Sequence, residues 1–463
     1  MEFVSLPQRI AAMLFEKKPT HDSSAVTPAS ETAGGTPRLR VPRRDQVEMH
    51  CFALDQLLPF DHAARVVWQA VKGWDLSRWL GKIKAVQGST GRASTDPRLL
   101  VALWVYATID GIGSAREIER RCETDVVYQW LCGGVSVNHH LLSDFRSKNE
   151  KAWDDLMTQI VASLLKARLV TMKRIAQDGM RVRASAGSSS FRRKGRLDLH
   201  LAQAREQVET LKRLAEENPD ELNKRQRAAQ ERAVRVREEL LEQARRECDE
   251  LQEKREKQAK ISGQPAKEAK ASSTDPEARI MKFADGGYRP GYNVQFATDV
   301  ESGVIVGVDT VNAGADSREL PPMLEQLEQR YQRRPAEALV DGGFSTRETI
   351  EKAAARNCLV FGPIKDEKKL LEQGEDPYAR KRRDSDAVAE WRTRMGTLAG
   401  KAISKLRGRT AEWVNAQARN RGFWQMPVRG LIKCRTVATL YAITHNLLQG
   451  VKLRAEASAG LGG

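Results

Sequence analysis

The sequence has few cysteines, no long hydrophobic run and no excess of acidic residues, and each absence excludes a class of protein. Its six cysteines are scattered without a CxxC pair, so they predict neither a disulfide framework nor a zinc site and favour a reducing compartment. The longest apolar run, residues 99–109, is far shorter than the roughly 20 residues of a membrane helix. Residues 1–18 lack the basic-then-apolar order of a secretory signal. We therefore expect a soluble, cytoplasmic protein that does not bind a membrane.

Positive charge is abundant and unevenly distributed. Lys and Arg number 77 against 61 Asp and Glu, a net charge of +16, which favours a polyanionic partner such as nucleic acid. Residues 196–260 hold 16 basic and 16 acidic residues, so the excess lies elsewhere. Residues 173–194 hold seven basic residues and one acid, and residues 378–435 hold 15 basic residues and four acids. Such runs are most often solvated faces, but isolated acids within them indicate candidate sites.

The N-terminal part divides into a flexible segment, residues 1–40, and a helical domain, residues 41–167. The flexible segment is rich in Ser, Thr, Pro and Gly. In the helical domain, residues 97–110 predict a helix, and Ser114 with Glu117 forms a capping box that begins another. A final polar helix spans residues 138–146. This pattern suits a helix-turn-helix-like DNA-binding domain, and an ordinary helical bundle fits it at least as well.

The remainder predicts an α/β domain interrupted by a helical hairpin. Residues 170–186 alternate as a strand does, and from Tyr292 a period of two returns, followed by alternating helices and strands. Between them, leucines and other apolar residues follow a helical stripe that is broken at Pro219. Residues 196–274 are therefore expected to form an antiparallel coiled-coil hairpin and a linker, inserted into the α/β domain.

Three acids stand out by their context. Asp178 lies in the first strand, Asp341 follows the apolar strand that ends at Val340, and Glu412 is the only acid between Glu390 and Glu456. Carboxylates at the ends of strands in a basic surface suit Mg²⁺, which takes its other ligands from phosphate and water. Asp-Gly is also a common turn dipeptide, and a lone helical Glu is usually solvated, so spacing alone does not select this trio.

On these residues the sequence resembles the DDE transposases of bacterial insertion sequences, in a branch with an InsH-like N-terminal domain. The resemblance extends over most of the chain and rests on short segments in the same order. They are residues 177–186, 275–279, 291–295, 340–344, 411–422, 428–431 and 445–447.

The resemblance implies a ribonuclease H-like catalytic domain, residues 168–195 and 275–450, with residues 451–463 as a flexible tail. Asp178, Asp341 and Glu412 would be its catalytic, metal-binding triad, holding two Mg²⁺ ions for which Mn²⁺ can substitute. The implied reaction is hydrolysis of a strand at the transposon end, followed by attack of the freed 3′-hydroxyl on a phosphodiester. The implied partners are double-stranded DNA, as terminal inverted repeats and as target, and a second copy of the chain in a homodimer.

Related transposases place a Tyr-x-x-Arg element before the glutamate and a basic residue seven positions after it. Arg419 matches the latter, but strict spacing puts Lys405 and Gly408 in the former. Arg407 and Arg409 flank the arginine position and are candidate substitutes. Trp424 is a candidate for stacking on an unpaired base, with core packing as the alternative. The expected DNA contacts are Arg181, Arg183, Arg407, Arg419, Arg421, Trp424, His139, His140 and Arg146.

Two other hypotheses compete with this one. A catalytically decayed or repurposed DNA-binding protein would keep the helical domain and the basic surfaces, and the missing Tyr-x-x-Arg element favours it. A coiled-coil scaffold would explain residues 196–260 but neither the basic clusters nor the α/β pattern. The intact trio of carboxylates favours the enzyme, because carboxylates in a purely DNA-binding surface would repel phosphate.

Overall fold

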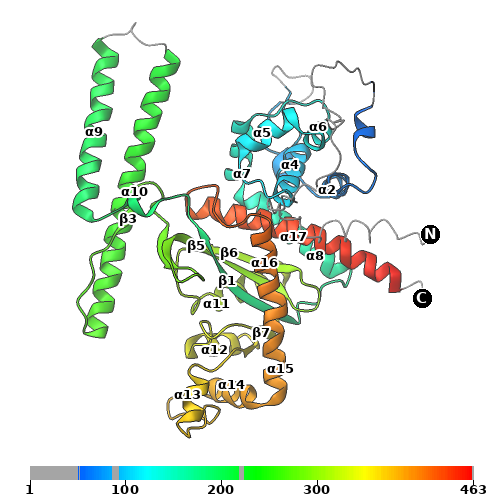
Figure 1. Ribbon diagram of the computed structural model, residues 1–463, viewed down its shortest axis with the longest axis vertical. Helices are drawn as coiled ribbons and strands as arrows, with labels where there is room; N and C mark the ends of the chain where they lie inside the picture. The colour runs from blue at the N-terminus through cyan, green and yellow to red at the C-terminus, as the bar shows by residue number, and fades with distance from the viewer. Residues whose placement is uncertain (1–50, 52, 86–92, 218–223, 461–463) are drawn as a thin grey trace, which may run out of the picture.

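The structure, a computed structural model, describes residues 51–460 apart from residue 52 and residues 86–92 and 218–223 (Figure 1). It contains a helical N-terminal region, a mixed α/β region and a pair of long helices. The flexible segment predicted for residues 1–40 and the break predicted at Pro219 lie outside the described residues.

The N-terminal region is built around large aromatic side chains. Trp104 and Tyr128 are fully buried, and Trp79 contacts the ring of Trp153 edge-on with centroids 5.3 Å apart. Ser114 accepts a hydrogen bond from the backbone of Glu117 and so caps a helix as predicted. The elements are η1 (Leu54–Leu57), α2 (Ala63–Lys72), α3 (Ser77–Leu80), α4 (Pro97–Ile109), α5 (Ala115–Thr124), α6 (Val126–Cys132), α7 (His139–Ser147) and α8 (Glu150–Lys166).

The α/β region is organised by a mixed sheet with β1 at its centre. The strand β5 pairs antiparallel with β1 on one side, and β7 pairs parallel with β1 on the other, followed by β8. Both β4 and β6 pair with β5. This mixed order is consistent with the expected ribonuclease H-like fold. The strands are β1 (Arg174–Arg183), β4 (Arg279–Lys282), β5 (Tyr288–Asp299), β6 (Ile305–Val311), β7 (Glu337–Leu339) and β8 (Leu359–Phe361).

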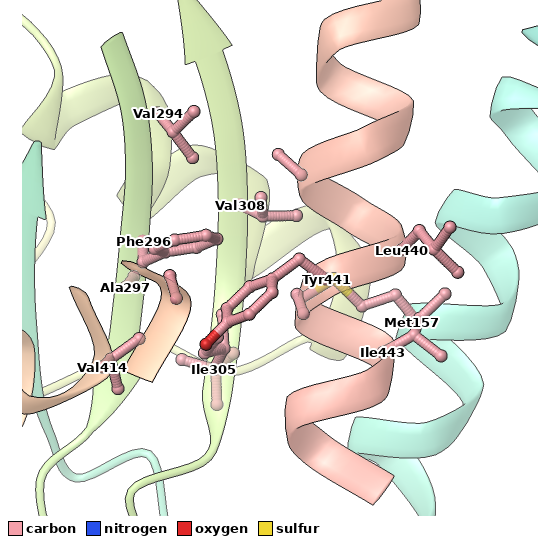
Figure 2. Close-up of a cluster of buried hydrophobic side chains, with 14 of the residues drawn as sticks. Met157, Val294, Phe296, Ala297, Ile305, Val308, Val414, Leu440, Tyr441 and Ile443 are labelled. Atoms are coloured by element: carbon pink, nitrogen blue, oxygen red, sulfur yellow. The ribbon is translucent and has the colours of Figure 1, made fainter. Parts of the chain in front are cut away.

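Helices cover both faces of this sheet. On one face, Tyr441 of α17 packs against Phe296 of β5, with ring centroids 5.7 Å apart, and Met157 of α8 lies on the far side of α17 (Figure 2). On the other face, α11 lies so close to β6 that a Cβ at Gly307 would contact Leu327 at 3.1 Å. The helices are α11 (Leu320–Tyr331), α12 (Arg347–Ala354), α13 (Glu367–Glu372), α14 (Asp386–Gly396), α15 (Leu398–Arg407), the π-helix η3 (Gly408–Glu412), α16 (Trp413–Asn420) and α17 (Leu431–Gly460).

Two long helices, α9 (Lys194–Glu217) and α10 (Lys224–Ser262), extend away from the sheet (Figure 1). They run antiparallel, because Arg205 pairs with Glu242 at 2.6 Å while Arg245, later in the chain, pairs with the earlier Asp198. A small separate core of Leu197, Leu241 and Cys248 holds them together near their base. The short strands β2 (Phe191–Arg192) and β3 (Ala271–Ser272) close the insertion.

The predicted flexible tail from residue 451 is wrong for residues 451–460. Helix α17 continues through them to Gly460. Val451 and Leu453 still pack against the main core, and Lys452 pairs with Glu456 one turn later, which together explain why the helix does not end at residue 450.

Candidate active site

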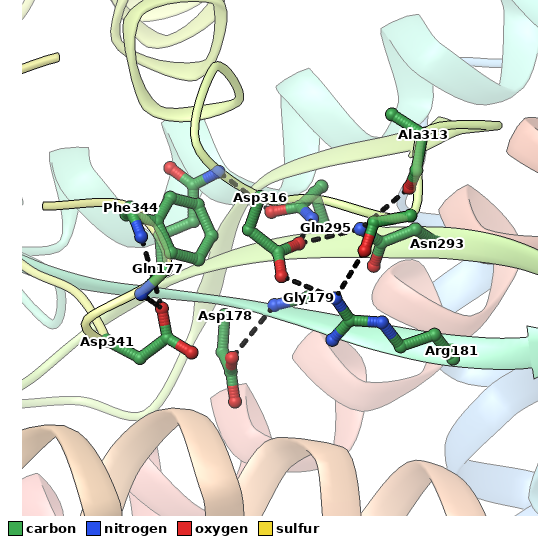
Figure 3. A network of polar contacts seen from close by, with 12 residues as sticks. Gln177, Asp178, Gly179, Arg181, Asn293, Gln295, Ala313, Asp316, Asp341 and Phe344 are labelled. Atoms are coloured by element: carbon green, nitrogen blue, oxygen red, sulfur yellow. Dashed lines mark hydrogen bonds and ion pairs between the residues drawn. The ribbon is translucent and has the colours of Figure 1, made fainter. Parts of the chain in front are cut away.

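The pairing of β1 with β7 brings two of the candidate carboxylates together. The parallel register aligns Ala176 with Leu339; two residues further along the chain lie Asp178, within β1, and Asp341, just past the end of β7. Neighbouring strands are about 4.8 Å apart, and equal offsets point side chains to the same face. Figure 3 shows the two carboxylates side by side at this edge of the sheet.

The two aspartates are held differently. Asp341 Oδ1 accepts hydrogen bonds from the backbone N–H groups of Gly343, at 2.8 Å, and Phe344, at 3.3 Å, so this residue does form the turn that its Asp-Gly dipeptide indicated. Asp178 Oδ1 accepts from the N–H of Gly179 at 2.9 Å, and its Oδ2 from Asn415 Nδ2 at 3.1 Å. Burial raises the pKa of Asp178 to about 6; Arg407 opposes that shift and Asp341 adds to it.

The third carboxylate, Glu412, is connected to Asp178 through Arg407. The guanidinium of Arg407 contacts Glu412 Oε1 at 2.9 Å and Asp178 Oδ2 at 3.6 Å. Glu412 itself is 58% exposed at the side chain. One cation thus bridges the strand carboxylate and the helix carboxylate.

A π-helical turn explains why Arg407, five residues before Glu412, faces it. Residues 408–412 form η3 between α15 and α16. In a π-helix the hydrogen bond joins residues five apart, so one extra residue fits into the turn. Arg407 therefore takes the place on the helix face that a regular α-helix gives to position 408. Of the two predicted substitutes for the family arginine, it is Arg407 that reaches the carboxylates.

The donor atoms around Asp178 suit a hard divalent cation. Besides the side-chain oxygens of the three acids, Asn415 Oδ1 is available as an oxygen ligand. It is buried and has no hydrogen-bond partner among the described residues. An all-oxygen set of this kind is the one that Mg²⁺ and Mn²⁺ prefer. Within the described part of the chain, however, no three His, Cys, Asp or Glu side chains gather closely enough to hold an ion, because Arg407 lies between Asp178 and Glu412.

The opposite face of β1 carries a buried polar network around Asp316 that sequence reasoning missed. Asp316 is 5% exposed and accepts from Asn293 Nδ2 at 2.6 Å, Gln295 Nε2 at 2.7 Å and Arg181 Nη2 at 2.7 Å (Figure 3). Gly179 lies directly under these groups and has no space for a side chain. Asn293 and Gln295 belong to a segment quoted for the family resemblance, but nothing in the sequence singles out Asp316.

Some of the predicted DNA contacts near the sheet are exposed, and others are engaged in ion pairs within the protein. Arg183, at the end of β1, is exposed. Trp424 is 59% exposed and lies 5.8 Å from the guanidinium of Arg419, so core packing is not its role. Arg181, by contrast, is engaged by Asp316 and by the carbonyl of Gly314, and Arg407 by the two carboxylates.

The predicted contacts on α7 are also divided. His139 Nδ1 lies 2.6 Å from a carboxylate oxygen of Glu119 on α5, and its ring centroid is 4.1 Å from that of His140. Arg146 is only 5% exposed, donates to the carbonyl of Gly113 at 2.7 Å and stacks on Trp104. Arg146 is therefore interior in this structure and does not belong to an exposed DNA-reading surface.

None of the helices in the described part of the chain has the length and apolar character that crossing a bilayer requires. The six cysteines form no disulfide.

Comparison with protein-family models gives two matches. Residues 52–148 match the model described as "Transposase domain (DUF772)", and residues 259–447 match "Transposase DDE domain". The second match contains Asp341 and Glu412, whereas Asp178 lies upstream of it, on the strand that pairs with β5 inside it. A search of curated proteins and a search of solved structures found no match.

The two matches identify a DDE transposase catalytic domain preceded by a transposase N-terminal domain. The chain is accordingly an enzyme of DNA cleavage and strand transfer, and enzymes of this class use divalent metal ions.

Proposed function

We propose that this DDE transposase mobilises a bacterial insertion sequence: it binds the terminal inverted repeats, hydrolyses a phosphodiester at each end and joins the freed 3′-hydroxyl to target DNA. The observation that carries this proposal is the adjacency of Asp178 and Asp341 on neighbouring parallel strands, with Glu412 tied to Asp178 through Arg407. Such an enzyme would act on DNA in the bacterial cytoplasm.

In this proposal Asp178, Asp341 and Glu412 hold the divalent cations, two Mg²⁺ or Mn²⁺ ions. When bound, such ions supply Lewis-acid activation of an attacking oxygen and stabilisation of a leaving one. Asn415 orients the Asp178 carboxylate through its hydrogen bond. Arg407 exchanges its carboxylate partners for phosphate oxygens when DNA enters, since a guanidinium binds both kinds of oxyanion in the same forked geometry.

Exposed residues around this edge provide the DNA surface. Arg183, which is exposed, and Arg419, which is half-buried, would contact the phosphate backbone near the carboxylates, and the exposed Trp424 would stack on a base unpaired at the cleavage site. The helical domain, with His140 exposed and His139 half-buried on α7, recognises the inverted repeats. Two copies of the chain act together as a homodimer, one at each transposon end.

The helical pair is proposed to be a coiled-coil insertion within the catalytic domain. Residues 168–195 and 275–450 would form that domain, with residues 196–274 as the insertion and residues 41–167 as the DNA-binding domain. Charged pairs such as Arg205–Glu242 line the helices, and apolar contacts are concentrated near their base. This composition suits an arm that holds its shape in water rather than a groove for nucleic acid.

A nicking assay tests the proposal. Duplexes that carry the ends of the element bracketing this reading frame are incubated with the full chain and Mg²⁺. We expect strand cleavage at the ends, loss of cleavage in EDTA, and loss of cleavage with retained binding in Asp341→Ala and Glu412→Ala. Cleavage at full rate in EDTA would overturn the metal mechanism. Specific binding without nicking in Mg²⁺ or Mn²⁺ would instead indicate the decayed, DNA-binding alternative.

A further inference from the structure

We propose that a cavity between the helical region and the catalytic domain is an anion site that takes a phosphate group. The cavity has a volume of about 190 Å³ and is lined from the helical side by Trp104, Gly113, Ser114 and Arg146. Arg421 and Tyr441 line it from the catalytic side. In Figure 1 the helical region lies against α17, which carries Tyr441.

The first reason is a buried cation without a counter-anion. Arg146 is 5% exposed, its guanidinium stacks 4.0 Å from the ring centre of Trp104, and it donates to the carbonyl of Gly113. Its Nε, however, is buried and has no hydrogen-bond partner within the described residues. Burial lowers the pKa of Arg146 to about 10; Cys434 opposes that shift, and no carboxylate among the described residues does. A buried charge is costly unless it is paired, so this arginine favours an anion beside it.

The second reason is a convergent donor from the other domain. Arg421 Nη1 is also buried and has no hydrogen-bond partner among the described residues. Among the described residues neither Arg146 nor Arg421 forms an ion pair with Asp or Glu. Two arginines that line one cavity and have no acidic partner supply the kind of donor with which proteins bind phosphate.

The cavity has the size for such a group, and its polar lining groups include the two arginines and Ser114. At about 30 Å³ for each water, its volume corresponds to several water molecules, so it is not merely a packing defect. Ser114 in its wall is the N-cap of α5, a helix of ten residues, and the partial positive charge of a helix N-terminus adds to the attraction for an anion. The arginines supply the specificity, since the helix end alone would not form a site.

The source of the phosphate is a DNA strand that runs from the carboxylates toward the helical region, and this step rests on the proposed function. The segment that carries Arg421 also carries Trp424, whose carbonyl accepts from the N–H of Arg183 at the end of β1. Asp178 lies on the same strand. A DNA backbone that follows this edge of the sheet passes the cavity, and a phosphate there would couple end recognition by one domain to positioning in the other.

Inorganic phosphate is the probe for the anion site, and it needs neither DNA nor metal. Thermal unfolding of the full chain in EDTA is followed with sodium phosphate or with NaCl of equal ionic strength. We expect phosphate to raise the midpoint beyond the NaCl value in the wild type, because a ligand that binds only the folded state stabilises it. Arg421→Gln should lose that increment and Arg421→Lys should keep part of it. Arg330→Gln is the matched control, because Arg330 is a mostly buried arginine paired with Asp154; it should lower the midpoint and keep the phosphate increment.

Binding to an end duplex, measured in EDTA as a function of salt, identifies the source. We expect the slope of log affinity against log salt to fall by about one in Arg421→Gln and not in Arg330→Gln, the loss of one phosphate contact. A lost phosphate increment with an unchanged salt slope would assign the site to a free phosphate compound instead of DNA. An increment equal to that of the wild type in both Arg421→Gln and Arg146→Gln overturns the proposal. Because neither measurement depends on cleavage, failure of the anion-site proposal can be told apart from failure of the nuclease proposal.

Discussion

The two faces of strand β1 hold two aspartates in opposite ways. Asp316 lies against one face and accepts from the side chains of Asn293, Gln295 and Arg181, all within 2.7 Å. Asp178, on the other face, accepts from the backbone N–H of Gly179 and from one side-chain amide, and its contact to Arg407 is longer, at 3.6 Å. A carboxylate that stabilises the fold is paired by its own chain, whereas a carboxylate that acts on a ligand is left with acceptor capacity. The difference predicts that Asp→Asn at Asp178 will mainly reduce DNA cleavage, whereas Asp→Asn at Asp316 will mainly reduce stability.

The largest effect is expected on cleavage, from Asp178→Asn. Losing a charged ligand for the cations removes several kcal/mol of transition-state stabilisation, so cleavage should fall by about 10³-fold or more. Stability at neutral pH should not fall, because burial already disfavours the charged form of Asp178. Cleavage kinetics and urea unfolding measure the two properties. Glu372→Gln, which removes an exposed carboxylate on α13, is the control. A markedly lower unfolding free energy in Asp178→Asn would contradict the expectation that this aspartate acts in cleavage and not in stability.

The next largest effect is on stability, from Asp316→Asn. The substitution leaves the guanidinium of Arg181, whose side chain is 27% exposed, without its charged partner, and because Arg181 is partly solvated the cost should be about 3 kcal/mol, the lower end of the range for a broken buried pair. Urea unfolding followed by circular dichroism gives the value. The double variant Arg181→Met/Asp316→Asn should recover part of the loss. A cost below about 1 kcal/mol would show that the network is not a structural element.

A smaller effect is expected from Gly179→Ala. The added Cβ would lie 2.6 Å from both Asn293 Oδ1 and Gln295 Nε2, and still closer to Asp316, so the network must shift. Overpacking of this kind typically costs about 1–3 kcal/mol. Because Gly179 is next to Asp178, cleavage should fall as well. Gly195→Ala, at a position with open space, is the matched control and should be neutral. Unchanged stability would indicate that the network adjusts freely.

The smallest effect is a pH dependence that originates from Glu319, beside the network. Burial raises the pKa of Glu319 from 4.5 to about 7, with Asp309 and Asp316 adding to the shift. The folded state therefore holds the proton more tightly than the unfolded state, and stability is lost as pH rises from about 4.5 through 7. Allowing for partial exposure, the loss is about 1–2 kcal/mol. Unfolding free energies of the wild type and Glu319→Gln between pH 5 and 8 test this, and parallel curves would contradict it.

Much of the fold could be predicted because its elements are locally encoded. The α4 helix, the capped start of α5 and the strands β5 and β6 follow from hydrophobic period and turn residues, which act over a few positions. The prediction of a flexible tail was wrong for a related reason. Residues 451–460 are polar and Ala-rich, but contacts of Val451 and Leu453 with a core distant in the sequence extend α17. Local composition does not report such contacts.

The candidate site was only partly accessible to sequence reasoning. Asp341 could be identified as an acid after a buried strand, and Asn415 could have been found three residues after Glu412, on the same helix face. The π-helical turn that brings Arg407 to the carboxylates has no spacing rule, so strict counting gave Gly408. The burial of Arg146 was likewise invisible, since a polar, basic helix looks the same whether its arginine faces solvent or another domain.

The sequence by itself determined the order of helices and strands and the list of candidate carboxylates, since side-chain period, turn chemistry and charge are properties of neighbouring residues. Only the tertiary structure decided how each charge is partnered. Asp178 and Asp316 belong to the same class of residue, yet pairing between segments far apart in the chain gives Asp316 a close arginine and two amides and gives Asp178 one side-chain amide and a more distant arginine. The free energy of a buried charge depends on the atoms around it, and those atoms are assembled by folding.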